Sequence, residues 1–490
     1  MPTTTRTWSF DPGRPLWRCA PPWQARGPVV LLDSAMDPGR LGRHSFLAVD
    51  PPALLTARRR RGAAAPGQPA PFLLALTTWR EPDGTVLAAP RERTWSGDPF
   101  AALRQLQAAY AVAGTSGDVP AGPFAGGLCG WLGYGLAHAL EHLPDTASGR
   151  ADQPDLCVVV ADDVLACDHA TGRTTLSITG RGPDPGADAA ARQERWRRLL
   201  AEPDRGPAPP GPPAEVAVRA PLDRAAYGAK VERCRRRILA GDVFEVCLTQ
   251  NLEADLPAPP WRLYEVLRAI NPAPFAAFVD AAGVQVVSAS PERFLRLDAD
   301  RQAESRPIKG TRPRGRDPAA DARLRDELAA SPKDRAENIM IVDLVRSDLG
   351  RVCATGSVAV PELLAVETYA TVHQLVSTVR GRLRPDRDAI DLVRACFPGG
   401  SMTGAPKIAA MGVIDAEEPA ARGVYSGALG YLDRDGAMDL SIVIRTLVCT
   451  GRLATFGVGG AVTADSDPDA EYEEAVDKGR AMVEALGRVR

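Results

Sequence analysis

Lysine is scarce in this chain of 490 residues. Only five of the 59 basic residues are lysines, namely Lys230, Lys309, Lys333, Lys407 and Lys478, so arginine supplies positive charge almost everywhere. An arginine cannot give up its proton to become a nucleophile, whereas a desolvated lysine can. We expect no special role for Lys230 and Lys333, whereas Lys309, Lys407 and Lys478 lie within the densest motifs.

Paired cysteines and long apolar runs are also missing. The nine cysteines are odd in number, scattered and form no C-x-x-C pair, which argues for a reducing compartment and against a zinc site. No stretch approaches the ~20 apolar residues of a membrane span, and the opening MPTTTRTWSFDPGRP has no apolar core of signal-peptide length. We therefore expect a cytoplasmic protein that does not bind a membrane.

A strong charge imbalance is absent too. The formal net charge is −2, with 45% hydrophobic and 24% charged residues, which is typical of a soluble globular enzyme and gives no reason to expect a nucleic-acid partner. The one dense basic run, at 58–61, follows a short apolar stretch and is interpreted as a solvated strand end. The length predicts two or three domains, or one large interlocked domain.

A proline- and glycine-rich segment divides the chain. Residues 206–220 are interpreted as an exposed, extended linker between an N-terminal α+β part at 1–205 and a second part at 221–490. Short β-rich runs, turns and amphipathic stretches occur in both parts, which predicts an α+β fold. The clearest elements are helices at 98–113, 188–201, 221–240 and 261–270 and a strand at 244–255.

The segment SPKDRAENIMIVDLVRSDLG (331–350) predicts a helix that carries a carboxylate on its apolar face. Ser331 stands at the N-cap position, Pro332 at the first helical position, and Asp334 completes an arrangement like a capping box. Glu337 then falls on an otherwise apolar stripe. A carboxylate there needs a partner, and a salt bridge, a capping role and a bound cation all remain open.

A second helix with carboxylates is expected near the C-terminal end. Asp467 and Pro468 signal its start, and Glu471, Glu474 and Lys478 then share one face. The two helices together offer hard oxygen ligands that suit Mg²⁺, which takes few protein ligands and keeps several waters. The alternative is that these acids form an ordinary solvated helix face.

Two glycine-rich turns accompany these helices. FPGGSMTGAPK (397–407) looks like a phosphate loop but fails the Walker pattern, because Ala-Pro precedes its lysine and no Ser or Thr follows. Its backbone N–H groups could still hold a carboxylate. FGVGGAVTADSD (456–467) would let the backbone approach a ligand closely. Arg445 ends an apolar stretch and needs an anionic partner, for which a bound carboxylate would be suitable.

Several motifs of the second part occur together in one known family. With SASPERF (288–294), RPIKGTRPRG (306–315), AENIMIVDLVRSDLGRV, VHQLVSTVRG, FPGGSMTGAPK, YSGALGYL, IVIRT and EYEEAVDK, the chain resembles the chorismate-utilising enzymes. That family includes anthranilate, aminodeoxychorismate, isochorismate and salicylate synthases. The resemblance covers essentially all of 221–490. In the part before residue 221 it rests on the segments LLDSA, GRHSFLAVDP and GGLCGWLGYG. It implies a large α+β sandwich of β-sheets flanked by helices.

The resemblance also implies a Mg²⁺ site and a substrate site for chorismate. The residues that match the metal ligands are Glu337 and Glu474, with Glu471 acting through water. The residues that match substrate contacts are Gly310, Thr311, Tyr425, Arg445, Gly459, Gly460, Ala461 and Lys478. The last turn reads Gly-Gly-Ala where many members read Gly-Ala-Gly, so its individual backbone contacts do not follow from the match.

Position 309 separates two subclasses in this resemblance. Anthranilate synthases read P-I-A-G-T there, whereas aminodeoxychorismate synthases read P-I-K-G-T, as this chain does. A neutral Lys309 amine would attack ring carbon C2 while the C4 hydroxyl leaves, and ammonia would then add at C4. Arg306 and Arg312 flank the lysine, so we expect their charge to lower its pKa. Glu292 matches the general acid and base, kept protonated by desolvation, and His373 assists at the same oxygen.

Two further enzyme classes remain as alternatives. An anthranilate synthase component or a 2-amino-2-deoxyisochorismate synthase would add ammonia at C2, and a catalytically silent homologue would lack Lys309, Glu292 or the metal carboxylates. Glu245 stands where the water-adding members carry a lysine, which argues against water addition. The chain has no G-x-C-x-G elbow, since Gly127-Leu128-Cys129-Gly130-Trp131 breaks that pattern. A separate glutamine amidotransferase subunit is therefore the expected source of ammonia.

A tryptophan pocket of the kind found in the family is a further expectation. The segments that resemble its lining contain Ser34 and Arg43 in the N-terminal part and Pro274 and Phe275 in NPAPF. Asp33 replaces the glutamate commonly seen in the regulatory version. Binding for regulation, purely structural binding and absence of tryptophan all remain open.

Overall fold

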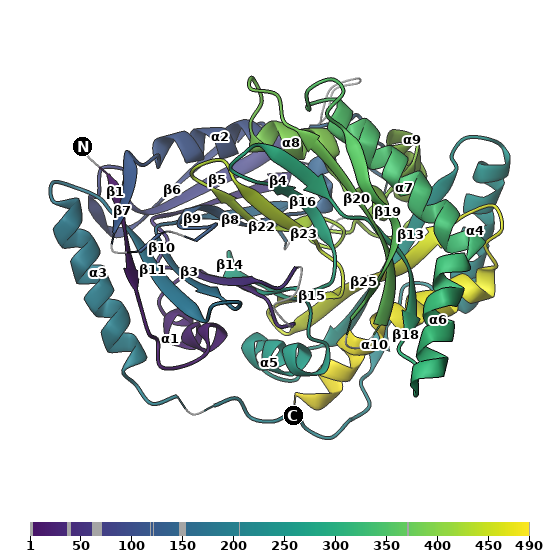
Figure 1. Ribbon diagram of the computed structural model, residues 1–490, viewed down its shortest axis with the longest axis horizontal. Helices are drawn as coiled ribbons and strands as arrows, with labels where there is room; N and C mark the ends of the chain where they lie inside the picture. Colours follow the sequence, from purple (N-terminus) through teal and green to yellow (C-terminus); the bar gives the residue numbers. More distant parts are fainter. Residues whose placement is uncertain are drawn as a thin grey trace.

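Two large β-sheets form the body of the protein (Figure 1). The computed structural model describes residues 3–36, 41–60, 71–117, 119–120, 122–146, 153–204, 206–369 and 372–489. The 13-stranded sheet runs in the order β12 (Val218–Arg219), β13 (Glu245–Asp255), β25 (Leu453–Val462), β24 (Thr446–Thr450), β15 (Val284–Ser290), β14 (Phe275–Ala281), β2 (Val29–Asp33), β3 (His44–Val49), β10 (Asp163–Asp168), β11 (Arg173–Gly180), β1 (Thr4–Ser9) and β7 (Gly114–Gly117), and β21 (Gly404–Ala405) pairs with β13.

The second sheet has 12 strands. Its order is β18 (Ile308–Pro313), β20 (Val372–Arg382), β17 (Gln302–Ser305), β16 (Arg293–Leu297), β23 (Met438–Ile442), β22 (Ala428–Asp433), β8 (Gly127–Leu132), β9 (Leu156–Ala161), β4 (Ala53–Arg59), β5 (Phe72–Arg80) and β6 (Val86–Gly97), and β19 (Ala359–Thr368) pairs with β20. The described helices are α1 (Pro21–Gln24), α2 (Pro99–Ala109), α3 (Pro185–Leu200), α4 (Arg224–Leu239), α5 (Pro260–Ile270), α6 (Pro318–Ala330), α7 (Pro332–Gly350), α8 (Ala389–Cys396), α9 (Lys407–Glu417) and α10 (Pro468–Arg488), with short 3₁₀ turns η1 (Leu16–Cys19), η2 (Tyr134–Ala139) and η3 (Gly400–Met402).

Both sheets are shared by the two parts of the chain. In the 13-stranded sheet β14 pairs antiparallel with β2, and in the 12-stranded sheet β22 pairs antiparallel with β8, where Gly430 lies opposite Gly130. The expected linker, 206–220, contains no strand before β12 and runs along the outside of the lower helices in Figure 1. The α+β sandwich is confirmed, and strands that are distant in sequence complete each sheet.

Alternating side chains explain why the strands are apolar on both faces. Along β8, Cys129 and Trp131 point into a core between the two sheets, whereas Leu128 and Leu132 point into an outer core shared with α2 and α8. A strand covered on both faces reads as a continuous apolar run. Helices α3, α5 and α10 cover the other sheet in the same manner (Figure 1). The result is a sandwich with three apolar layers.

The expected helix starts are confirmed at the two helices that matter for the site. The Ser331 hydroxyl accepts from the backbone N–H of Asp334 at 3.3 Å, and the Asp467 carboxylate accepts from the N–H of Ala470 at 2.9 Å. The helix expected at 98–113 ends earlier, at Ala109, because Gly114 begins a strand that pairs with β1. No described helix is long and apolar enough to cross a membrane.

Candidate active site

One cavity of about 700 Å³ contains most of the predicted site residues. It lies among β13, β18, β25, α7, α10 and the glycine-rich turn that precedes α9. Its size suits a small organic ligand. The predicted residues that line it are Glu292, Lys309, Gly310, Thr311, Glu337, Tyr425, Arg445, Gly459, Gly460, Ala461, Glu474 and Lys478.

A β-bulge directs Lys309 toward this cavity. In the pairing of β18 with β20, Ile308 lies opposite Val376 and Thr311 opposite Gln374, so β18 has one extra residue at Lys309 or Gly310. Such a bulge re-aims side chains and breaks the regular alternation of a strand. Gly310 has φ +87°, and a Cβ there would come within 2.8 Å of Asp334, so the bulge needs glycine at this position.

The charge environment of Lys309 differs from the expectation. Its ammonium lies 2.6 Å from Glu245 Oε1 and 3.7 Å from Glu337 Oε2. Burial alone would lower the pKa of Lys309, but these two carboxylates outweigh burial and raise it.

The prediction that Arg306 and Arg312 lower this pKa is therefore wrong. Arg306 pairs with Glu367, and Arg312 pairs with Glu327 at 3.0 Å and with Asp334 at 3.1 Å, so each guanidinium is engaged away from the amine. Glu245 is fully buried, and its second oxygen, Oε2, has no hydrogen-bond partner. The sequence analysis noted Glu245 because of its position but assigned it no role, and the structure shows that its carboxylate contacts Lys309.

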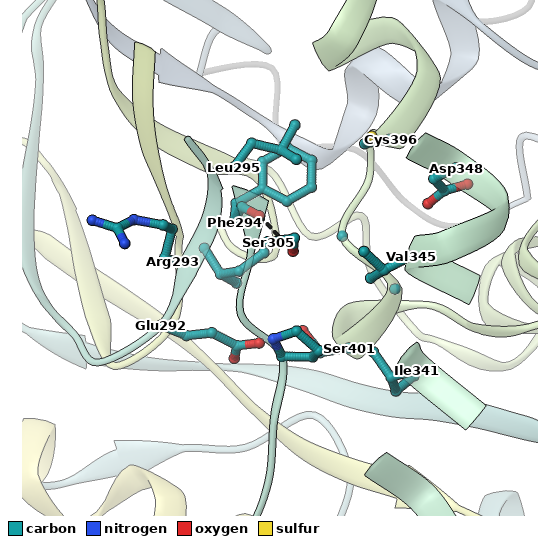
Figure 2. Close-up of a pocket in the computed structure, with 14 residues that line it drawn as sticks. Glu292, Arg293, Phe294, Leu295, Ser305, Ile341, Val345, Asp348, Cys396 and Ser401 are labelled. Carbon is teal, nitrogen blue, oxygen red and sulfur yellow. Dashed lines mark hydrogen bonds between the residues drawn. The ribbon is translucent and has the colours of Figure 1, made fainter. Parts of the chain in front are cut away.

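Glu292 has the environment of a general acid. It lies between β15 and β16, is 7% exposed, and burial raises its pKa to about 7 although the Ser401 hydroxyl group opposes the rise. Figure 2 shows its carboxyl group beside Ser401 on one wall of a small pocket. The expectation that desolvation keeps Glu292 protonated is confirmed in direction, since a carboxyl with this pKa holds its proton near neutral pH.

Two of the predicted metal carboxylates, Glu337 and Glu474, line the cavity, and Glu471 lies behind its wall within 3.5 Å of Lys333. Burial raises the pKa of Glu337 to about 7 and also raises that of Glu471. Glu337 Oε1 and Glu471 Oε2 are buried without a hydrogen-bond partner, and a Cβ on Gly460 would lie 2.8 Å from Glu471 Oε2 and 3.3 Å from Glu474 Oε1. Buried carboxylate oxygens left unpaired fit a divalent cation. Among the described residues, no group of three or more carboxylate, imidazole or thiol side chains is arranged so that it could hold a metal ion, so a cation there would take few protein ligands.

A cationic wall faces these carboxylates. Arg445 donates to the carbonyl oxygen of Lys478 at 2.6 Å, and no carboxylate of the described chain lies within salt-bridge distance of it. Burial lowers the pKa of Arg445, as expected for a guanidinium that lacks a paired anion. Lys478 donates to the carbonyl of Gly459 at 2.9 Å and contacts Glu474 at 2.6 Å. The Tyr425 ring packs on Gly457, where a Cβ would collide with it.

His373 lies apart from the predicted constellation. It is 1% exposed, its Nδ1 is 2.9 Å from the Thr368 hydroxyl, and its Nε2 is 3.1 Å from Asp321. The described lining of the cavity includes the next residue, Gln374, but not His373. The predicted role at the substrate hydroxyl would require the ring to leave both partners.

Several residues that sequence reasoning did not assign to the cavity also line it, and three of them are polar side chains close to the predicted site. Ser401 lies in the glycine-rich turn, Gln374 follows the histidine on β20, and Lys333 lies 3.5 Å from Glu471 and 3.9 Å from Glu337. The scarcity of lysine was a signal for Lys333, but we expected no role for it. Position on a helix face alone did not show that α7 and α10 approach each other here.

A second cavity, of about 310 Å³, brings together the residues predicted for a tryptophan pocket. Ser34, Arg43, Pro274 and Phe275 all line it, and it shares no lining residue with the larger cavity. Asp33 also lines it and accepts hydrogen bonds from Tyr264, Arg268 and Ser45. The binding of tryptophan there stays a prediction.

Known proteins are similar to this chain in sequence over most of its length. Residues 67–484 match the family model described as chorismate binding enzyme. The chain is 50% identical over 381 residues to an aminodeoxychorismate synthase of Streptomyces griseus, a match that covers 76% of this chain and 52% of that protein. It is 41% identical over 404 residues to aminodeoxychorismate synthase component 1 of Salmonella typhimurium, covering 82% and 85%.

A solved structure gives the same fold. Anthranilate synthase component I from Streptococcus pneumoniae superposes with a TM-score of 0.72 at 28% sequence identity, covering 90% of this chain and 92% of that one. The chain spans about half the length of the Streptomyces relatives that it matches.

Proposed function

Because the chain belongs to the family of chorismate-binding enzymes, we propose that it replaces the C4 hydroxyl of chorismate by ammonia, giving 4-amino-4-deoxychorismate without release of pyruvate. The observation that carries this proposal is the amine of Lys309 on the wall of a cavity that also contains Glu292 and the cations Arg445 and Lys478. Two relatives named aminodeoxychorismate synthase support the same class of reaction.

In the proposed reaction Lys309 is the nucleophile. Its amine attacks ring carbon C2 while the C4 hydroxyl leaves, and ammonia then bonds to C4 as the lysine departs. Glu245 Oε1, at 2.6 Å from the ammonium, is placed to accept the proton that the amine must lose before it attacks. Glu292 donates its proton to the departing hydroxyl, which leaves as water.

The cationic wall binds the substrate carboxylates in this proposal. Arg445 and Lys478 are two of the positive side chains that line the cavity, and Tyr425 lines it as well. A bound Mg²⁺ would add positive charge to hold the ring carboxylate, with Glu337 and Glu474 as its ligands and Glu471 acting through water. The carboxylate donor set and its unpaired buried oxygens fit such an ion.

Replacing either metal carboxylate should weaken magnesium binding. We expect Glu337→Gln and Glu474→Gln to raise the Mg²⁺ concentration for half-maximal activity by roughly tenfold or more, since each loses a charged oxygen ligand. Calorimetric Mg²⁺ titration provides a readout that does not depend on turnover. Glu484→Gln is the matched control, because Glu484 lies on the same helix as Glu474, pairs with Arg488 and does not line the cavity. An unchanged titration in one variant would remove that residue from the proposed site.

The ammonia would come from a partner. The Salmonella relative is named component 1, which fits an aminating component that acts with a second one. We propose that a glutamine amidotransferase subunit supplies ammonia, and that free ammonium can replace it in vitro.

Product identification tests the proposed function. The purified chain is incubated with chorismate, Mg²⁺ and ammonium, and the product is identified by chromatography and mass spectrometry. The expected product carries nitrogen para to the ring carboxylate and keeps its enolpyruvyl group. Amination at C2 is the second candidate, because the solved structural neighbour is an anthranilate synthase component. An ortho product, or pyruvate released without an added lyase, would establish that candidate instead.

A further inference from the structure

The glycine-rich turn at 397–406 forms part of the wall of the active-site cavity. Ser401 and Met402 line that cavity, and the end of the turn forms β21, which pairs with β13. A Cβ on Gly400 would lie 2.7 Å from Leu344 Cδ2, so the turn packs directly on α7. The position of Ser401 therefore depends on how the ends of the turn are held.

One buried lysine closes the turn. Lys407, the first residue of α9, donates to the carbonyl oxygen of Cys396, the last residue of α8, at 2.6 Å. The same ammonium lies 2.6 Å from Asp348 Oδ2 on α7. Lys407 is 8% exposed and Asp348 is 5% exposed, and Arg351 contacts the other oxygen of Asp348. A single side chain thus ties three helices together around the turn.

Stability alone is a weak reason for such a buried pair. Removing two charges from water is costly, and an apolar replacement of a buried ion pair is often neutral or stabilising. Lys407 is moreover one of only five lysines in the chain, and the proposed reaction gives it no part. The contacts of this pair instead hold the ends of the turn in a fixed geometry.

A small pocket is lined both by Asp348 of this pair and by Glu292. Its volume is about 20 Å³, which is near the room that one water needs. Glu292 and Ser401 line it at one end and Asp348 and Cys396 at the other (Figure 2). The turn therefore lies near both the Lys407–Asp348 ion pair and the proposed proton donor, Glu292.

Ser401 lines both the small pocket and the active-site cavity together with Glu292, and its hydroxyl group lowers the pKa of that carboxyl group against the effect of burial. The other groups that face Glu292 are the ammonium of Lys309 on β18, the N–H of Ile308 and the ammonium of Lys478 on α10. Of these, only Ser401 is carried by the turn that Lys407 closes. A loosened turn would change this one contact first.

We propose that Lys407 and Asp348 are positioning residues for the amination: they fix the glycine-rich turn so that Ser401 holds the Glu292 carboxyl group in place. This inference rests on the proposed function of Glu292. Neither residue of the pair lines the active-site cavity, so the effect passes through Ser401.

A double-mutant cycle tests the proposal. Lys407→Met, Ser401→Ala and the double variant are compared with the unmodified chain for kcat and KM, with chorismate, Mg²⁺ and ammonium, as a function of pH. We expect each single variant to lower kcat by roughly 10- to 100-fold with little change in KM. Loss of the Ser401 hydroxyl group, which lowers the pKa of Glu292, should raise that pKa, so the alkaline fall of kcat should move up by about one pH unit or less.

The signature of positioning is that the double variant resembles either single variant. Lys230→Met is the matched control. Lys230 pairs with Glu417, the last residue of α9, whereas Lys407 is its first residue, and Lys230 does not line the cavity. Effects that multiply, or a folded Lys407→Met chain with an unchanged kcat and pH profile, would overturn the inference. Asp348→Asn should give the same pH shift if Lys407→Met does not fold. An inactive unmodified chain would instead contradict the proposed function.

Discussion

Lys309→Ala should abolish formation of the para-amino product. We expect kcat to fall by at least about 10³-fold, because the variant keeps the cavity but loses the nucleophile on which the other groups act. Substrate binding should persist, since the cationic wall at Arg445 and Lys478 is unchanged. Steady-state product formation measures the loss, and intact-mass analysis during turnover should show an adduct on the unmodified chain but not on the variant.

The lysine content of the chain provides a direct control. Lys230→Ala removes a lysine of α4 that pairs with Glu417 at 3.7 Å, outside the cavity, and should keep full activity. A Lys309→Ala chain that retains full para-amination, together with no adduct in the unmodified chain, would show that the nucleophile is not Lys309. Loss of folding is checked by the thermal midpoint of unfolding.

Glu292→Gln should have the second largest effect. The amide keeps the shape of the side chain but cannot donate the acid proton, so we expect kcat to fall by roughly 10²- to 10⁴-fold with KM nearly constant. Glu484→Gln is the matched control, because Glu484 pairs with Arg488 on the exposed side of α10. Equal activity of the two variants would exclude Glu292 as the proton donor.

The pH dependence of the unmodified chain has a defined sign. Burial raises the pKa of Glu292 to about 7, so the carboxyl is protonated below this value and loses its proton above it. Because the acid form is the proton donor, kcat should decline as pH rises through about 7. This alkaline decline should be absent from the residual activity of Glu292→Gln. A decline of equal size and position in both chains would assign it to another group.

Local signals predicted the elements that carry the site. Ser331 with Pro332, and Asp467 with Pro468, mark helix starts whose caps depend only on neighbouring residues, and both helices begin where expected. The raised pKa of Glu292 was expected from the family resemblance, and its cause is burial by the assembled sheets rather than the local sequence. Helix caps can be predicted because the residues that form them lie within a few positions of one another in the sequence.

Long-range contacts explain what the sequence did not predict. The pKa of Lys309 is raised because Glu245, 64 positions away, lies against its ammonium, while Arg306 engages Glu367. The pairing of β22 with β8 joins residues about three hundred positions apart. Periodicity identifies a strand but not its neighbour. Only the assembled sheets show which charges meet in the cavity.

The sharing of both sheets between the two parts has a consequence for protein engineering. Neither part completes a sheet alone, because β2 needs β14 and β8 needs β22 as neighbours. The segment 206–217, by contrast, contains no helix or strand. A chain opened there would form a split enzyme, whose fragments become active only by complementing each other. The N-terminal part is therefore scaffold for the chemistry rather than a removable module.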